Sequence, residues 1–319
     1  MLPPTRSRSR RRRALVAALG IAVAAVLAAG CFPPPPPPPG PLTPLPIGIT
    51  HAVGTRQITF VDTSRPTQPF GAYPGSSSRR IPTTISYPSD GGGPFPLVVF
   101  IPGFGATGAN YASLINRIAA AGYVVAAPAY PLLSGQPAGP TDVIGWDDLA
   151  PDTWFVTTQV LQLSSSGGAP LGGLVDPNRI AVAGHSDGAA IAFDVGYRPF
   201  KLDTRVRAVV SFATGLQYYG PYQPNGRPIL HMLSDQDVYN PYGEAIAWDR
   251  ANLQDPKVVL SLWNASHEGP FTNSADPHYE LVVGMTIGWL DTVLKAHPEA
   301  LFFASIYAAD HPALGALGG

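Results

Sequence analysis

The sequence is most constrained by a serine that lies between two glycines at the end of an apolar run. Residues 179–190 read RIAVAGHSDGAA and contain the segment Gly184-His185-Ser186-Asp187-Gly188. The spacing G-x-S-x-G is typical of a nucleophile elbow, a sharp turn between a strand and a helix that exposes its serine. Glycine at both positions lets backbone segments approach closely around the turn. We therefore predict a strand, a turn and a helix here, with Ser186 as the candidate nucleophile; the alternative is an ordinary glycine–serine turn.

The N-terminus has the organisation of an export signal. Six arginines within residues 6–13 precede an apolar stretch at 14–30, which is too short and too rich in alanine and glycine for a typical membrane span. It ends in Leu27-Ala28-Ala29-Gly30-Cys31, which resembles the lipobox of bacterial lipoproteins, whose cysteine becomes the lipid-modified first residue after cleavage. We expect a signal peptide at 1–30, lipidation of Cys31 and a location in the bacterial cell envelope. An uncleaved signal anchor is the alternative.

The segment after Cys31 is a proline-rich spacer that extends to residue 47 and contains seven consecutive prolines at 33–39. Such a composition favours an extended polyproline II conformation, with a disordered tail as the alternative. Because Cys31 is the only cysteine, the mature chain has no internal disulfide. The leader holds six of the 20 basic residues and no acidic ones, which leaves 14 basic and 21 acidic residues, a net charge of −7. We therefore expect no nucleic-acid binding.

The remaining chain alternates between apolar strands and helices, an order that predicts one α/β domain over residues 48–305 followed by a C-terminal tail at 306–319. The continuous apolar run at 96–101 is typical of a parallel strand that is buried on both faces. The first two predicted strands are expected to pair antiparallel at one edge of the sheet. Besides the elbow strand, the predicted strands are 56–61, 81–87, 96–101, 123–127, 206–212, 228–233 and 258–263, and the predicted helices are 110–121, 153–163, one after Pro241, and 279–295.

A loop is predicted from residue 128 to residue 152, where substrate-facing loops of such folds lie. It contains Asp142, Asp147, Asp148 and Asp152. We interpret these aspartates as loop and helix-cap residues and not as a metal site, because no histidine or glutamate accompanies them.

A serine nucleophile requires a base that takes its proton and a carboxylate that orients the base. In sheets that carry a nucleophile elbow, these partners follow on later strands in the order Ser, Asp, His. The strand at 228–233 is followed by Asp235 and Asp237, and the strand at 258–263 is followed by His267. We predict His267 as the base and favour Asp237 as the acid, because Asp-x-x-x-Pro leads directly into the next helix. Asp235 is the alternative.

Two backbone N–H groups are also needed to stabilise the developing alkoxide. The residue after the nucleophile, Asp187, supplies one of them in this interpretation. Phe104, in the turn after the strand at 96–101, supplies the other. His185 is expected to pack beneath the elbow.

These motifs together resemble the branch of the α/β-hydrolase superfamily that contains bacterial cutinases, polyester hydrolases and esterases similar to platelet-activating-factor acetylhydrolase and dienelactone hydrolase. The resemblance covers about residues 81–267. It implies an α/β-hydrolase fold with a mostly parallel central sheet, helices on both faces and a single domain. It also implies hydrolysis of carboxylic esters through an acyl-serine intermediate, with no metal or organic cofactor. The segments that carry it are Pro102-Gly103-Phe104, 176–179, 184–188, 237–241 and 265–267.

The chain departs from that family at three points. Asp187 stands where polyester-active members carry Met or Gln, and a carboxylate that points into the cleft is expected to slow acylation. Phe212-Ala213-Thr214 replaces the family's Ala-Pro-Trp, so the tryptophan that would stack on an aromatic acyl group is absent. The candidate replacements for it are Tyr218, Tyr219 and Tyr239, for which packing is the alternative role. The C-terminal disulfide of cutinase relatives cannot form with one cysteine.

We therefore expect an exported, monomeric serine esterase that acts on a small ester or lipid-like substrate and contacts the membrane through its lipid anchor. Two alternatives stay open. A non-catalytic surface lipoprotein would keep the same scaffold for binding, and an acyltransferase would use the same triad with an alcohol as acceptor.

Overall fold

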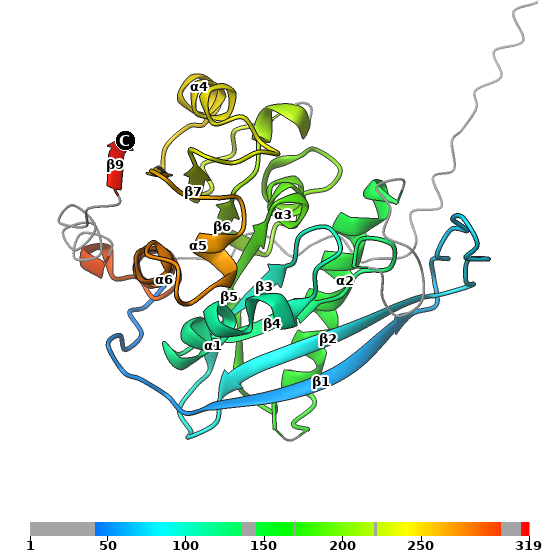
Figure 1. The fold of residues 1–319 in the computed structure, drawn as a ribbon. Helices are drawn as coiled ribbons and strands as arrows, with labels where there is room; N and C mark the ends of the chain where they lie inside the picture. The colour runs from blue at the N-terminus through cyan, green and yellow to red at the C-terminus, as the bar shows by residue number, and fades with distance from the viewer. Residues whose placement is uncertain (1–41, 135–144, 169, 220–221, 301–313, 319) are drawn as a thin grey trace, which may run out of the picture. The chain divides into compact units, whose positions relative to one another are not determined.

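A single mixed β-sheet with helices on both faces forms the framework of this computed structural model, which describes residues 42–134, 145–168, 170–219, 222–300 and 314–318 (Figure 1). The strands are β1 (Val53–Asp62), β2 (Arg79–Pro88), β3 (Phe95–Ile101), β4 (Val124–Pro128), β5 (Val175–His185), β6 (Val206–Phe212), β7 (Ile229–Ser234), β8 (Lys257–Leu262) and β9 (Leu314–Gly318). Their spatial order is β1-β2-β4-β3-β5-β6-β7-β8-β9. The pairings from β4 through β8 are parallel, and those of β1 with β2, β2 with β4, and β8 with β9 are antiparallel.

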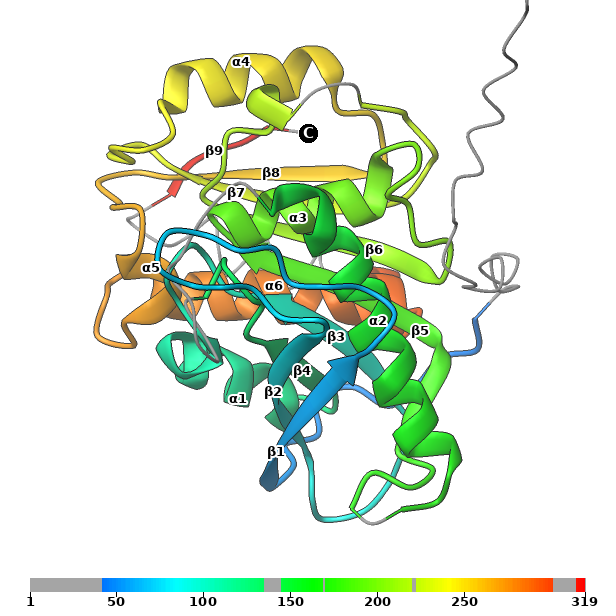
Figure 2. The ribbon, with the colours of Figure 1, turned by 90° about the vertical axis from the view of Figure 1, so that its right-hand side faces the viewer.

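The helices divide between the two faces of the sheet. They are α1 (Ala112–Ala120), α2 (Trp146–Ser165), α3 (Asp187–Tyr197), α4 (Tyr242–Asn252), α5 (Gly269–Thr272) and α6 (Tyr279–Leu294), with short 3₁₀ segments η1 (Gly108–Tyr111) and η2 (Leu216–Tyr219). On β3, Val99 and Ile101 join the core formed with α2 and α3, whereas Val98 and Phe100 join the core formed with α1 and α6. Figure 2 shows α2 and α3 on one side of the strands and α6 on the other. Both faces of β3 are therefore covered, which explains its uninterrupted apolar sequence.

The predicted α/β class and the antiparallel edge strands are confirmed, but the predicted start of α2 is wrong. The helix begins at Trp146, not at residue 153, and it contains Pro151. Asp148 and Asp152, one turn apart, both bind Arg79 of β2, with Oδ2 atoms at 3.1 Å from Nη1 and 2.5 Å from Nη2. The Arg79 side chain is fully buried. These ion pairs fold the first turns of α2 onto a strand far away in sequence, which no local pattern reveals; Asp142 lies outside the described residues.

The C-terminal segment predicted as a tail contributes a strand to the sheet. Leu314–Gly318 forms β9, which runs antiparallel to β8 with Leu317 opposite Leu260. Residues 306–313 and 319 lie outside the described part of the chain. The pairing depends on a free edge of β8, and the local composition of alanine, glycine and leucine does not indicate it.

The end of the predicted spacer packs against the domain. The backbone N–H of Leu45 donates to the Lys295 carbonyl at 3.1 Å, and the guanidinium of Arg179 donates to the Thr43 carbonyl. Residues 1–41, which include the predicted signal peptide and Cys31, lie outside the described residues. Among the helices that the structure describes, none has the length and apolar character that crossing a bilayer requires.

Candidate active site

Ser186 occupies a strained turn between β5 and α3. Its φ of 55° and ψ of −127° lie outside the regions that non-glycine residues ordinarily adopt. The turn is held by a hydrogen bond from the Ser186 N–H to the Phe212 carbonyl of β6, at 2.9 Å. A Cβ atom on Gly188 would overlap the carbonyl oxygen of Ile101, and one on Gly184 would overlap the backbone of Gly188. The two glycines are therefore required by close backbone contact, as the sequence pattern predicts for an elbow.

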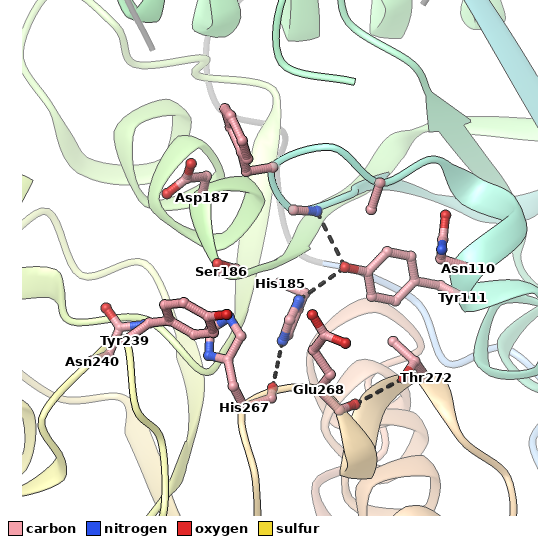
Figure 3. A pocket seen from close by; sticks show the side chains of 13 residues that line it. Asn110, Tyr111, His185, Ser186, Asp187, Tyr239, Asn240, His267, Glu268 and Thr272 are labelled. Atoms are coloured by element: carbon pink, nitrogen blue, oxygen red, sulfur yellow. Dashed lines mark hydrogen bonds between the residues drawn. The ribbon is translucent and has the colours of Figure 1, made fainter. Parts of the chain in front are cut away.

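The serine opens into a cavity of about 830 Å³ at the carboxyl ends of the parallel strands (Figure 3). The cavity walls come from the turn after β3, from the elbow and from the loops after β7 and β8. Of the predicted site residues, Ser186, Asp187, Phe104, Tyr239 and His267 all line it. The other lining residues are Gly103, Ala106, Asn110, Tyr111, His185, Asn240, Glu268 and Thr272.

Asp237 lies behind His267 and holds its imidazole ring. The Nδ1 atom of His267 is 2.7 Å from Oδ2 of Asp237, and the Asp237 side chain is almost fully buried. Burial by itself raises the pKa of this carboxyl group. Hydrogen bonds from His267 and from the backbone N–H groups of Asn240 and Tyr239 outweigh burial and hold the pKa below its ordinary value. An ionised Asp237 accepts the Nδ1 proton, so Nε2 of His267 is the nitrogen that can act as a base.

The alternative acid, Asp235, has a different partner. Its Oδ1 accepts a hydrogen bond from the backbone N–H of Ala265 at 3.1 Å, which ties the loop after β7 to the loop after β8. The structure thus brings Asp237, and not Asp235, into contact with the ring of His267.

The turn after β3 presents one unused backbone donor beside the cavity. The N–H of Gly103 donates to the hydroxyl of Tyr111 at 3.2 Å, and the N–H of Gly105 donates to the Leu133 carbonyl at 2.9 Å. Between them, the N–H of Phe104 donates to no acceptor among the described residues. This is the arrangement expected of an oxyanion donor. The predicted second donor, the N–H of Asp187, belongs to the first residue of α3.

The three tyrosines proposed to replace the stacking tryptophan are only partly described by the structure. Tyr239 is 71% exposed, and its ring lies edge-on to the ring of His267 with centroids 4.9 Å apart. Tyr218 and Tyr219 belong to η2, but their side chains are outside the described part of the structure. The Asp187 carboxylate points away from His267 in Figure 3.

Of the lining residues that the sequence did not identify as site residues, three have side chains that bear on the arrangement of the site: Glu268, Asn240 and Tyr111. Glu268 follows His267 directly, and that adjacency was the available signal. Asn240 donates to the Ala213 carbonyl and accepts from the Gly215 N–H, so it joins the loops after β6 and β7. Tyr111 has no local signal, because only the tertiary structure brings its hydroxyl to 2.8 Å from Nδ1 of His185.

A second histidine–aspartate pair lies outside the cavity. Nδ1 of His231, on β7, is 2.9 Å from Oδ2 of Asp249, on α4, and both side chains are fully buried. This pair has no access to the cavity and joins a helix to the sheet. Among the described residues, no group of three or more histidine, cysteine, aspartate or glutamate side chains converges as a metal site.

Comparison with known proteins agrees with this architecture. Residues 70–214 match the model of the family described as Chlorophyllase, a match that includes Phe104 and Ser186 but ends before Asp237 and His267. The ferulic acid esterase from Streptomyces cinnamoneus superimposes with a TM-score of 0.62 over 79% of this chain and 93% of its own, at 21% sequence identity. No curated protein matches the chain. The structural likeness confirms the predicted α/β-hydrolase fold.

The assignment of Asp237 can be tested by covalent labelling of Ser186. We expect a fluorophosphonate probe to label the mature protein, and Asp237→Asn to slow labelling by about 100-fold or more, because the neutral amide no longer holds the productive tautomer of His267. The measurement is the labelling rate followed by intact-protein mass spectrometry.

Asp235→Asn is the matched control, since an asparagine oxygen can still accept the Ala265 N–H, and its labelling rate is expected to stay within about twofold of the wild type. Equal losses in the two variants, or labelling that persists in Ser186→Ala, would contradict the assignment.

Proposed function

We propose that the protein is a serine hydrolase that cleaves carboxylic esters through an acyl-serine intermediate. The observation that carries the proposal is the 2.7 Å contact between His267 and Asp237, with His267 and Ser186 lining one cavity. The match to the chlorophyllase family model and the likeness to a protein named as an esterase support an ester as the substrate. The further proposals, that the enzyme is monomeric and acts on a small ester or lipid-like molecule, rest on the sequence resemblance.

The chemistry follows from the positions of three side chains. Nε2 of His267 takes the proton of Ser186 while the serine oxygen attacks the ester carbonyl. The ionised Asp237 stabilises the imidazolium that forms. Collapse of the tetrahedral intermediate breaks the bond to the alcohol, which receives the proton from His267. Water then attacks the acyl-serine with His267 again as the base, and the carboxylic acid and Ser186 are released.

The negative oxygen of each tetrahedral intermediate is assigned to the N–H groups of Phe104 and Asp187. The removal of one such donor costs roughly 3–4 kcal/mol of transition-state stabilisation in enzymes of this type. The N-terminus of α3 adds its positive dipole end at the same place. The Asp187 carboxylate lines the same cavity and points away from His267.

The charge of the cavity favours some esters over others. Asp187 and Glu268 are the carboxylates among its described lining residues, and no lysine or arginine is among them. The Glu268 charge reaches Tyr111, whose pKa is raised by burial and by this carboxylate. His267 returns its proton to the leaving alcohol, so the alcohol portion lies beside the loop that also carries Glu268. We propose that alcohols with a positive charge are preferred and anionic ones are disfavoured.

We also propose that the chain is exported and anchored by a lipid on Cys31. The proposal rests on the basic N-terminal region, the apolar stretch and the cysteine that follows it. Residues 43–45 join the domain near Arg179, at the start of β5, whereas Ser186 follows the end of the same strand. Residues 43–45 therefore join the domain at the amino end of β5, whereas the cavity lies at the carboxyl ends of the parallel strands.

Hydrolysis of short p-nitrophenyl esters by the purified mature domain tests the main proposal. We expect turnover by the wild type and a loss of at least about 1,000-fold in Ser186→Ala, because that variant has no nucleophile. Equal turnover by both proteins, or none by either, would contradict ester hydrolysis by this site. In the second case a non-catalytic binding protein is favoured. Product analysis with added alcohols separates transfer from hydrolysis.

Charge selectivity is tested with acetylthiocholine and its uncharged isostere, 3,3-dimethylbutyl thioacetate. We expect kcat/KM to be about two- to fivefold higher for the cationic ester at low salt, with the ratio approaching one at about 0.5 M salt because the charges are screened. Glu268→Gln is expected to remove most of the preference. Glu280→Gln is the control, because Glu280 is an exposed carboxylate that pairs with Arg117 and does not line the cavity. This variant is expected to keep the preference for the cationic ester. A ratio that is the same in all three proteins would contradict the proposal.

The anchor is tested by Cys31→Ser in a bacterial host. The wild-type chain is expected to incorporate an azide-labelled fatty acid and to fractionate with membranes, because a thioether-linked lipid adds apolar surface. The variant is expected to do neither, while its esterase activity per molecule stays unchanged. Labelling that survives in the variant, or tight membrane association without Cys31, would overturn the lipid anchor.

A further inference from the structure

A continuous chain of buried hydrogen bonds runs along the lining of the cavity from the turn after β3 to the loop after β8 (Figure 3). The N–H of Gly103 donates to the Tyr111 hydroxyl at 3.2 Å. The Tyr111 oxygen lies 2.8 Å from Nδ1 of His185, and Nε2 of His185 lies 2.7 Å from the carbonyl oxygen of His267. Each bond joins two different elements of the fold, and the last two bonds each connect residues more than 70 positions apart in the sequence.

The direction of every bond in this chain is determined. The His267 carbonyl can only accept, so Nε2 of His185 carries the proton. Burial, reinforced by the positive charge of a protonated His267, lowers the pKa of His185 to about 3, so its ring is neutral and Nδ1 can only accept. Tyr111 stays protonated because burial and the charge of Glu268 raise its pKa, and its O–H donates to Nδ1. One tautomer of His185 satisfies all the groups.

We infer that Tyr111 and His185 are positioning residues that set the relative placement of the oxyanion donor, the nucleophile and the base. Gly103 precedes Phe104, His185 precedes Ser186, and the accepting carbonyl belongs to His267 itself. Phe104, Ser186 and His267 are therefore each either a member of the hydrogen-bonded chain or the residue that directly follows a member. Since a displacement of about 1 Å can cost about 100-fold in rate, a network that links the three segments acts on turnover. The inference rests on the proposed ester hydrolysis.

Packing alone does not explain the polar atoms. Tyr111 stacks at an angle on Phe100, with ring centroids 4.9 Å apart, and His185 contacts Phe271 at 5.2 Å. A phenylalanine and an apolar side chain would fill the same space. They would leave the Gly103 N–H and the His267 carbonyl without these partners, and a buried polar group without a partner costs free energy.

Tyr111→Phe tests the inference, with Tyr130→Phe as the matched control. Both variants remove one hydroxyl from a fully buried tyrosine, and the Tyr130 hydroxyl bonds Thr153 away from the cavity lining. We expect similar decreases in melting temperature. For Tyr111→Phe we expect kcat on a p-nitrophenyl ester to fall by about 10- to 100-fold with KM within about twofold. For Tyr130→Phe we expect kcat to stay within about twofold of the wild type.

His185→Gln provides the second variant. The glutamine Nε2 can still donate to the His267 carbonyl, but it offers no acceptor at the position of Nδ1. Because it breaks the link to Tyr111, we expect its kcat to fall by about 10-fold, and Tyr111→Phe to add less than about twofold in the double variant. The loss in Tyr111→Phe is expected to be constant from about pH 6 to pH 9, since neither Tyr111 nor His185 titrates there.

Results that differ from these expectations overturn the inference. Wild-type kcat in Tyr111→Phe, a loss no greater than that of Tyr130→Phe, or fully multiplicative losses in the double variant would show that the chain does not position the site. A loss that changes with pH would assign Tyr111 a proton-transfer role instead. If the wild type shows ester hydrolysis that depends on Ser186, these failures concern the positioning network alone. If it shows none, the proposed function fails and the network has no reaction to position.

Discussion

The close approach of α3 to the ends of β3 and β5 is the constraint on which the site depends. Gly188 lies against the carbonyl oxygens of Ile101 and Pro102, and Gly184 lies against the backbone of Gly188. Only glycine fits at either position, and the tight turn between them places Ser186 at a positive φ. The same approach brings the start of α3 next to the turn that carries Phe104. One packing contact therefore sets the position of the nucleophile and of both predicted oxyanion donors.

The carboxyl edge of the sheet collects the remaining groups because β3, β5, β7 and β8 run parallel. Loops that follow parallel strands emerge at one edge, so residues separated by more than 160 positions meet there. Precise placement needs more than topology, since loops are the mobile part of a fold. Here hydrogen bonds join the segments that carry the site: Asp235 to Ala265, Asn240 to Ala213, and His185 to His267. The site is thus held together by paired polar groups.

Electrostatics divides the site into two regions. Behind His267, buried Asp237 receives four hydrogen bonds and stays ionised, as the imidazolium of the proposed reaction requires. In front, the described lining of the cavity includes the carboxylates of Asp187 and Glu268, whereas the proposed reaction builds negative charge on the carbonyl oxygen. The N-terminus of α3 and the N–H of Phe104 oppose that repulsion locally. In the proposed reaction, the oxyanion donors and the two carboxylates therefore act on different parts of the substrate.

Local sequence patterns were sufficient for the framework and for naming Ser186 and His267 as candidates. The length of the apolar runs and the spacing of the glycines identify β3, β5 and the elbow, because burial on both faces requires apolar residues and close backbone contact requires glycine. The order Ser, Asp, His is that of partners carried on successive later strands of such a sheet. The proximity of Asp237 to His267 and the separate role of Asp235 were decided only by the tertiary structure, since both carboxylates lie in one loop. The same holds for the start of α2, for β9 and for the bonds of Tyr111, because each depends on a partner from a distant element. A sequence determines which groups are available at each turn, whereas the packing of strands and helices determines which of them meet.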